Sequence, residues 1–257
     1  MLPPTRSAIQ PTRSATRLPT KSSAAAGVRW LLISAVLALA FLVLAPPIPQ
    51  DQDYHLFADQ RSVLGFPNFW NVISNFPFLL VGVLGLCAFH DAASRVLFAG
   101  VALTAFGSGY YHLHPNDATL VWDRLPITLV FMPLLALVIS QWMGPAWGRR
   151  LLWPLVLFGI ASVVWWRYTG DLRPYAVAQF GPALVMLPAF GFDRTIRGLW
   201  PAGALYSLAK LAETFDRGIY AAIPVSGHTL KHLAAALATF WILHWRRSTP
   251  PLAMKLN

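Results

Sequence analysis

The stretch SGHTLKHLAAALATFWILHW, residues 226–245, reads as one long apolar helix that carries two histidines near its start. A helix of about 20 apolar residues is long enough to cross the hydrocarbon core of a bilayer. Similar apolar segments recur along nearly the whole chain, at about 28–46, 69–89, 95–112, 124–142, 151–167, 176–192 and 198–215. The sequence therefore predicts an all-α, polytopic membrane bundle of eight spans.

The composition supports a membrane protein and argues against other classes. Hydrophobic residues make up 56% of the chain and charged residues 12%, whereas about 25% charged residues is usual for soluble domains. The single cysteine, Cys87, lies within an apolar segment, which excludes a disulfide framework and a cysteine-based metal site. The net charge of +10 comes from basic residues that flank the apolar segments. This is the pattern of membrane topology, so we expect no nucleic-acid partner.

The two ends of the chain differ from its middle. Residues 1–27 are rich in Pro, Ser, Thr and Arg and contain few large apolar residues, so we expect a disordered, basic cytoplasmic tail. The segment 28–46 is then an extra N-terminal span, 50–245 is the core, and 246–257 is a cytoplasmic C-terminal tail. The seventh apolar segment contains Lys210 and Glu213 and is followed directly by Asp216, so a re-entrant or interfacial helix is the alternative there.

The distribution of basic residues tests the number of spans. With eight spans and a cytoplasmic N-terminus, thirteen of the twenty Lys and Arg residues fall on the cytoplasmic side and two lie inside the last two spans. The remaining five lie on the opposite side: Arg61, Arg124, Arg167, Arg173 and Arg217. This excess follows the positive-inside rule. Removing the seventh span would weaken it, so we expect both termini to be cytoplasmic.

Polar side chains inside the predicted spans converge on one membrane level. His112 ends the third span on the outer side, Asp123 begins the fourth there, and His228 and His232 lie in the first turns of the eighth. Residues four apart share a helix face with their Cβ atoms about 5–6 Å apart, so the last two histidines can bind one metal ion. We expect Lys231 to point to another face. Interfacial histidines bonded to backbone or water are the alternative.

The segment FGSGYYHLHPNDATLVWDRLP, residues 106–126, adds a second pair at the same spacing, Ser108 and His112. His114 is expected in the turn that follows, and Asp117 at a helix start. Three imidazoles with an open position are typical of catalytic zinc, which lowers the pKa of a bound water to about 7. Asp123 would then act as general base or hold a ligand, and Ser108 would help to bind an oxyanion.

Two other chemistries are compatible with the same residues. Ser108 could be the nucleophile of a serine hydrolase, but GSG lacks the G-x-S-x-G elbow and this reading leaves His228 and His232 unused. The polar cluster could also belong to the ion path of a transporter. Its confinement to one side of the membrane argues against a path that threads the bilayer.

Several motifs together resemble the alkaline ceramidases and the wider superfamily of seven-helix membrane hydrolases that includes the adiponectin receptors. They are GSGYYH, then WDRLP, then SGHTLKH in the last span, preceded by PNFWNVISNFPFLLVG at residues 67–82 with its F-W-N-x-x-S-N signature. The resemblance covers about residues 50–245 and looks closest to bacterial ceramidase-like membrane proteins. It implies a seven-helix hydrolase core preceded by one extra span, in a bacterial inner membrane.

The resemblance also implies a site and a reaction. His112, His228 and His232 would bind zinc, with Ser108 and Asp123 completing the site near the outer side. The implied activity is hydrolysis of the N-acyl amide bond of a ceramide-like lipid. A receptor-like or structural protein with a non-catalytic zinc site is the alternative, as is a hydrolase of another lipid amide or ester.

Two further groups of acidic or polar residues lie near these motifs in the sequence, and each has two possible roles. In the eukaryotic relatives an acidic calcium site lies at the first core helix, but here Asn68 replaces the helix-start carboxylate, and Asp51 and Asp53 do not clearly reproduce the pattern. A hydrated loop is the alternative to calcium binding. Glu213 and Asp216 could orient a ligand histidine, or pair with Lys210 and Arg217 to hold the seventh span together. We favour the structural role.

Overall fold

The computed structural model describes residues 20–249, and within them the chain is all-helical. The first half contains the helices α1 (Lys21–Leu44), α2 (Phe69–Ile73), α3 (Phe76–Ala88), α4 (Ala92–Leu113) and α5 (Asp117–Met143), with a 3₁₀ helix at Gln52–His55. The second half contains α6 (Pro145–Thr169), α7 (Arg173–Phe192), α8 (Arg194–Arg197), α9 (Trp200–Thr214), α10 (Asp216–Ala222) and α11 (Gly227–Ser248).

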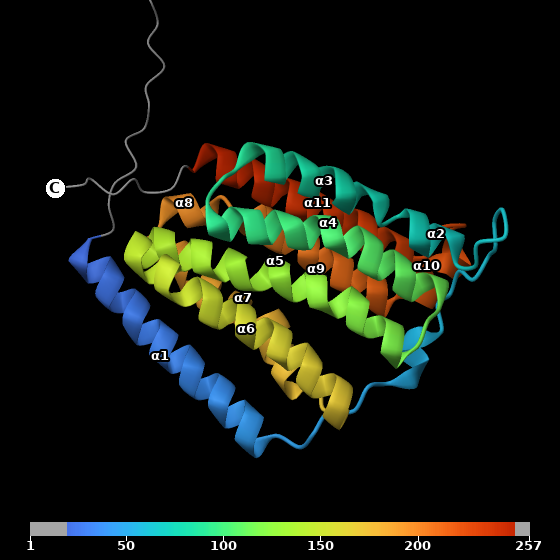
Figure 1. Cartoon of the computed structure of the whole chain (residues 1–257), viewed down its shortest axis with the longest axis horizontal. Coiled ribbons are helices and arrows are strands. Elements are labelled where there is room, and N and C mark those ends of the chain that lie inside the picture. Colours follow the sequence, from blue (N-terminus) through green and yellow to red (C-terminus); the bar gives the residue numbers. More distant parts are fainter. Residues whose placement is uncertain (1–19, 250–257) are drawn as a thin grey trace, which may run out of the picture.

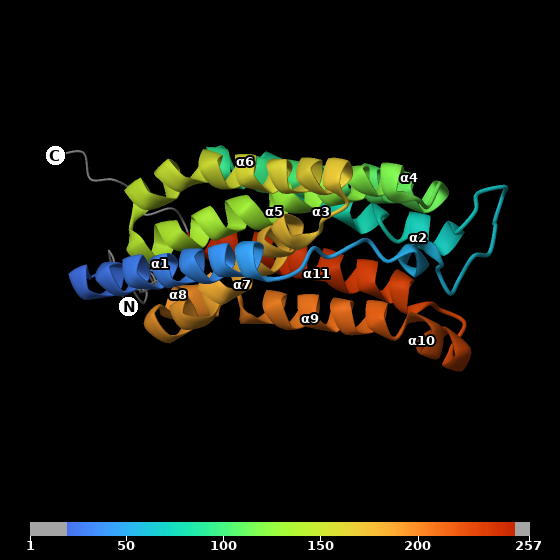
Figure 2. The ribbon, with the colours of Figure 1, turned by 90° about the horizontal axis from the view of Figure 1, so that it is seen from below.

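Long helices run side by side along the longest axis of the molecule and alternate in direction (Figures 1 and 2). The start of α1, the short α8 and the end of α11 lie at one end of the bundle. The short helices α2 and α10 and the long loop 45–68 lie at the other. Because α4 ends and α11 begins at this second end, His112 and His228 are brought to the same level of the bundle.

The helices at the two ends of the chain extend further than predicted. α1 begins at Lys21, where the Thr20 hydroxyl caps it by accepting a hydrogen bond from the Ser23 N–H, so residues 21–27 are helical and not part of a disordered tail. Residues 1–19 of that predicted tail lie outside the described residues. α11 continues through Arg247 to Ser248. The predicted C-terminal tail therefore begins at least three residues later, and residues 250–257 also lie outside the described part.

Within residues 20–249, five helical segments are long and apolar enough to cross a membrane. They are Ser22–Leu44, Phe69–Ala88, Ala92–Leu113, Asp117–Met143 and Pro145–Thr169. They match the first five predicted spans, and many of their large apolar side chains face outward, as expected for contact with lipid. α9 has 15 residues, which is short for a crossing, and α11 carries several histidines and basic residues. Membrane insertion is therefore supported, whereas the count of eight spans stays a prediction.

The second predicted span is broken between α2 and α3. α2 ends at Ile73 and α3 begins at Phe76, with Pro77 directly after it. Pro77 has no N–H to donate to the Ile73 carbonyl, and its ring would collide with that carbonyl in a continuous helix. The break leaves Ser74 and Asn75 buried between the two helices, where their side chains reach α11.

Small residues let α4 and α5 approach closely and set the site in register. A Cβ atom on Gly107 would lie 2.0 Å from the Trp122 carbonyl oxygen, and one on Gly100 would lie 2.8 Å from the backbone of Leu129. Close packing of this kind is typical of small residues in membrane helices. It places Ser108, the next residue after Gly107, against Asp123, the next residue after Trp122.

Candidate metal centre

The three histidines singled out from the sequence meet in the interior of the bundle. His112 comes from the last turn of α4, and His228 and His232 come from the first two turns of α11. One ring nitrogen of each lies within 4.8 Å of the others, and Nε2 of His112 is 3.2 Å from Nε2 of His232. All three are at most 4% exposed. This cluster could hold a metal ion.

The start of α11 is fixed by two oxygen acceptors. The Ser226 hydroxyl accepts a hydrogen bond from the Thr229 N–H at 3.0 Å, and Oδ1 of Asp216 accepts one from the His228 N–H at 2.8 Å. Such caps satisfy N–H groups that have no partner within the helix. Gly227 permits close approach, because a Cβ atom there would lie 2.1 Å from the Ala212 carbonyl oxygen. The rotation of α11, and with it the direction of both histidines, is therefore set locally.

Ser74 orients His232 and was missed by the sequence analysis. Its Oγ lies 2.8 Å from Nδ1 of His232 and donates to the Asn71 carbonyl oxygen at 3.2 Å. Since the Ser74 proton is directed at Asn71, its lone pair can accept from Nδ1–H of the imidazole. That tautomer leaves Nε2 unprotonated and available to a metal. The F-W-N-x-x-S-N stretch contained the signal, because three of its polar residues, Asn71, Ser74 and Asn75, are buried at this site.

An aromatic side chain from the loop 45–68 covers the cluster. The ring centroid of Phe57 lies 4.6 Å from that of His112 and 4.7 Å from that of His228, and Phe57 is 4% exposed. Nδ1 of His112 is buried, and the described residues offer it no hydrogen-bond partner. The covering ring shields the cluster from water at the end of the bundle.

A cavity of about 690 Å³ opens beside the histidines and runs between the helices. Its polar end includes Ser108, Asp123 and His232, and its remainder is lined mainly by apolar residues of α5, α7, α9 and α11. Ser108 and Asp123 are 2% and 6% exposed. The residues that the sequence placed beside the three histidines therefore share one cavity with His232.

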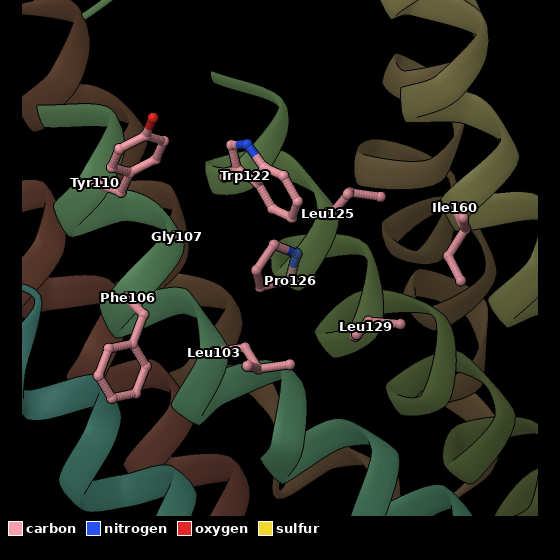
Figure 3. Close-up of a pocket in the computed structure, with 9 residues that line it drawn as sticks. All are labelled: Leu103, Phe106, Gly107, Tyr110, Trp122, Leu125, Pro126, Leu129 and Ile160. Carbon is pink, nitrogen blue, oxygen red and sulfur yellow. The ribbon is translucent and has the colours of Figure 1, made fainter. Parts of the chain in front are cut away.

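A second hollow, of about 470 Å³, lies on the bundle surface formed by α4, α5 and α6 (Figure 3). Phe106 and Tyr110 from α4 and Trp122 from α5 flank it, and Gly107 and Pro126 form part of its wall (Figure 3). None of the histidines of the cluster lines it. It is an apolar groove, and the contact between α4 and α5 separates it from the histidine cluster.

The prediction that Lys231 points away from the histidines is wrong. Its Nζ lies 3.3 Å from Nε2 of His228 and 2.5 Å from Oε1 of Glu213, and it lines the cavity. Residues three apart on a helix share a face as residues four apart do, so Lys231 lies over the same side as His228. A buried ammonium group therefore accompanies the cluster.

Glu213 and Asp216 contact other groups than histidine rings. Glu213 accepts hydrogen bonds from Lys210, Lys231 and the Tyr54 hydroxyl, the last at 3.0 Å. Asp216 accepts from two backbone N–H groups, those of His228 and Ala58. The pairing of Glu213 with Lys210 agrees with the structural role, whereas Asp216 is used as a helix cap and not as a partner of Arg217.

The three candidate calcium ligands do not share one site: Asp51 and Asp53 contact each other, whereas Asn68 contacts the end of α4. Asp51 and Asp53 are exposed, and Asp51 accepts a hydrogen bond from the Asp53 N–H at the start of the 3₁₀ helix. Asn68 is buried and donates to the His112 carbonyl oxygen at 2.9 Å, so it supports the end of α4. In the described part of the chain, the histidine cluster is the group of His, Cys, Asp or Glu side chains that is suited to a metal.

Two neighbouring residues of the sequence motif stay outside the cluster. His114 is exposed in the turn after α4, where its carbonyl oxygen accepts a hydrogen bond from the Thr119 hydroxyl. Asp117 is the first residue of α5 and lies 3.0 Å from Nε2 of His55. Both placements agree with the turn and the helix start expected from the sequence.

Comparison with known proteins adds one finding. Residues 66–189 match the family model described as Ceramidase. The matched segment contains Ser108, His112 and Asp123, and it ends before α11 with its two histidines. No curated protein matches the chain. The similarity to the ceramidase family model therefore covers just under half of the chain, from α2 into α7.

Proposed function

We propose that the protein is a zinc-dependent membrane hydrolase that cleaves the N-acyl amide bond of a ceramide-like lipid. One observation carries the proposal: three buried imidazoles converge, and one of them, His232, lines a large and mainly apolar cavity. A metal ion held by these imidazoles could meet the amide of a lipid whose acyl chain lies between the helices. The match of residues 66–189 to the ceramidase family model supports the amide as the bond that is cleaved.

The donor set suits Zn²⁺. Imidazole is a preferred ligand of zinc, and three histidines without a fourth protein ligand are typical of catalytic rather than structural sites. His112, His228 and His232 would hold the ion, and the contact of Ser74 with Nδ1 of His232 keeps the opposite nitrogen free for it. When bound, zinc polarises a carbonyl group and lowers the pKa of a water at the open position.

The other polar residues supply proton transfer and charge stabilisation. The carboxylate of Asp123 takes a proton from the attacking water and passes it to the nitrogen of the leaving amine as the C–N bond breaks, so that one water and one amide give a carboxylic acid and an amine. The Ser108 hydroxyl, which lies against Asp123, donates to the carbonyl oxygen as negative charge develops there. Phe57 and the closely packed α4 and α5 keep bulk water away from these groups.

The cavity determines the shape of the substrate. Its volume of about 690 Å³ lies within the range of 300–1,000 Å³ that is usual for ligand pockets. An acyl chain would lie along its apolar wall, which includes Phe131, Leu134 and Met186, while the amide reaches His232 and Asp123. A water-soluble amide would gain little from such a wall.

The first experiment measures zinc and hydrolysis together. We expect about one zinc per purified chain, and we expect His232→Ala to lose both the metal and the hydrolysis of a fluorescent ceramide. Ser108→Ala should keep the metal but lose about 10²- to 10³-fold in kcat, the usual effect of losing one oxyanion donor. Zinc without turnover on any acyl amide would point to a receptor-like or structural role. Normal activity of a metal-free His232→Ala protein would exclude the mechanism.

We also propose the orientation of the site. Eight spans with both termini in the cytoplasm would place the histidine cluster near the outer side of a bacterial inner membrane. The positive-inside bias and the alternating direction of the long helices support this arrangement.

A further inference from the structure

Arg124 is a buried cation that lines the same cavity as His232 of the histidine cluster. It directly follows Asp123 in α5, is 6% exposed, and lines the polar end of the cavity together with Tyr54 and Lys231. A buried charge is costly unless it is paired and fully hydrogen-bonded. The contacts of its guanidinium group should therefore show what offsets the cost of burying the charge.

The guanidinium group is held in place, but its charge has no carboxylate partner. It lies over the ring of Trp166 at 4.0 Å and of Tyr175 at 4.8 Å from the centroids, and Nη2 donates to Oε1 of Gln50 at 2.5 Å. Nη1 is buried and has no hydrogen-bond partner among the residues that the structure describes. Over residues 20–249, none of the ion pairs involves Arg124.

Other arginines of the same protein show what a purely structural role looks like. Arg246 is 2% exposed, and its three nitrogens reach Asp91, Ser94 and the Thr249 carbonyl oxygen. Arg173 pairs with Asp171 and donates to two carbonyl oxygens at the end of α1. In both, a carboxylate offsets the charge. Arg124 departs from this pattern, and it lines the cavity that also contains His232.

The charges around the polar end of the cavity favour an anion. Arg124, Lys210 and Lys231 line it as cations, and Asp123 and Glu213 line it as anions. Glu213 is already engaged by both lysines. The guanidinium fork matches the oxygens of a carboxylate or phosphate, which can accept two parallel hydrogen bonds. The apolar remainder of the cavity suits an acyl chain, so an anion would belong to the amine half of the substrate.

We propose that Arg124 is a specificity-determining residue that binds an anionic group on the amine half of the substrate. The natural substrate is then an acidic N-acyl lipid, with a carboxylate or phosphate beyond the amide, rather than a neutral ceramide. This inference rests on the proposed amide hydrolysis. Trp166, Tyr175 and Gln50 hold the guanidinium group in advance, so binding requires little reorganisation of the protein.

The test compares pairs of substrates that share an acyl chain, of which one member carries an anionic group and the other does not. N-palmitoylglycine and N-palmitoylethanolamine share one acyl chain and differ by a carboxylate against a hydroxymethyl group. In neutral detergent, we expect the wild type to favour the glycine amide in kcat/KM by at least about tenfold, as one charge-assisted hydrogen bond would give. Arg124→Gln should bring this ratio close to one. A second pair, ceramide 1-phosphate and ceramide, tests whether phosphate is the preferred anion.

Two further variants separate specificity from folding and from general charge. Arg167→Gln removes an exposed positive charge next to Trp166 and should leave the substrate ratio unchanged. Arg124→Lys keeps the charge but loses the fork, so it should give an intermediate ratio even if Arg124→Gln does not fold. Hydrolysis with the same ratio in the wild type and both Arg124 variants, for both substrate pairs, would overturn this inference alone. Loss of turnover on every substrate in the zinc-loaded wild type would instead overturn the proposed function.

Discussion

The ring orientation of His232 is set by a contact with Ser74, which lies 158 positions away in the chain. Its Nδ1 lies 2.8 Å from Oγ of Ser74, and the Ser74 hydroxyl donates a hydrogen bond to the Asn71 carbonyl oxygen, which leaves a Ser74 lone pair to accept from Nδ1–H. Partners of this kind fix the tautomer and the ring orientation of a metal ligand, and they raise its basicity. The break between α2 and α3 is what allows Ser74 to reach the ring, so a proline-induced feature of the backbone serves the candidate metal site.

Removing the Ser74 hydroxyl should weaken zinc binding. We expect Ser74→Ala to lower zinc affinity by about 10- to 100-fold, because His232 would no longer be held in the tautomer that binds through Nε2. Competition with a chelator of known affinity measures the change. Ser162→Ala is the matched control, because Ser162 is equally buried but donates to the Gly159 carbonyl oxygen within α6. Equal zinc affinity in both variants would show that the Ser74 contact does not tune the site.

The sequence predicted the three histidines of the cluster better than their surroundings. The spacing of four residues suffices to place His228 and His232 on one face, because that relation is local to a helix. Lys231 was misplaced because residues three apart share that face too. The contacts of Ser74, Phe57 and Arg124 join segments far apart in the chain, and no local pattern encodes such contacts.

At the level of the helices, α1 is fastened to the bundle at both ends. Near its start, the Trp30 indole donates to the Leu184 carbonyl oxygen at 2.8 Å. At its end, Arg173 donates to the carbonyl oxygens of Leu42 and Ala45, and Asp171 accepts from the Ile48 N–H. Hydropathy predicted that this segment is a helix, but a predicted span carries no information on which helix it packs against. The side-chain contacts with α7 supply that information.

Stability should depend on pH through Asp171. The Arg173 guanidinium group and backbone N–H groups donate to this carboxylate and hold its pKa at about 2, below the usual value for Asp. Because the folded-state pKa is lowered, the stabilisation is present above the unfolded pKa of about 3.9 and is lost as the pH falls towards 2. At neutral pH, Asp171→Asn should lower the free energy of unfolding by about 1–3 kcal/mol.

Thermal unfolding in detergent between pH 2 and pH 7 measures this effect. The wild type and Asp171→Asn should differ at neutral pH and converge as the pH approaches 2. Asp53→Asn, which changes an exposed carboxylate of the loop 45–68, serves as the control and should follow the wild-type curve. A constant difference between Asp171→Asn and the wild type over the whole range would mean that the charge of Asp171 is not what stabilises the end of α1.

Across the whole molecule, ion pairing and burial reduce the exposed positive charge at the predicted outer end. Of the five basic residues on the predicted outer side, Arg61 pairs with Asp59, Arg173 pairs with Asp171, and Arg124 is buried in the cavity. The exposed positive charge at this end is therefore carried by Arg167 and Arg217. At the opposite end Arg246 pairs with Asp91, and Arg150 and Arg247 are exposed. Pairing and burial thus remove three of the five basic residues from the exposed, unpaired positive charge of the predicted outer end.

Labelling of single cysteines should show the candidate site at the outer end. In a Cys87→Ser background, Gln60→Cys in the loop 45–68 should react with a membrane-impermeant maleimide in intact cells, because this loop would face away from the cytoplasm. Arg247→Cys, near the end of α11, should react only after the membrane is permeabilised. If α9 did not cross the membrane, the two ends of α11 would exchange sides and Arg247→Cys would be labelled in intact cells. A protected Gln60→Cys would place the histidine cluster on the cytoplasmic side, and lipid substrates would then have to enter from the inner leaflet.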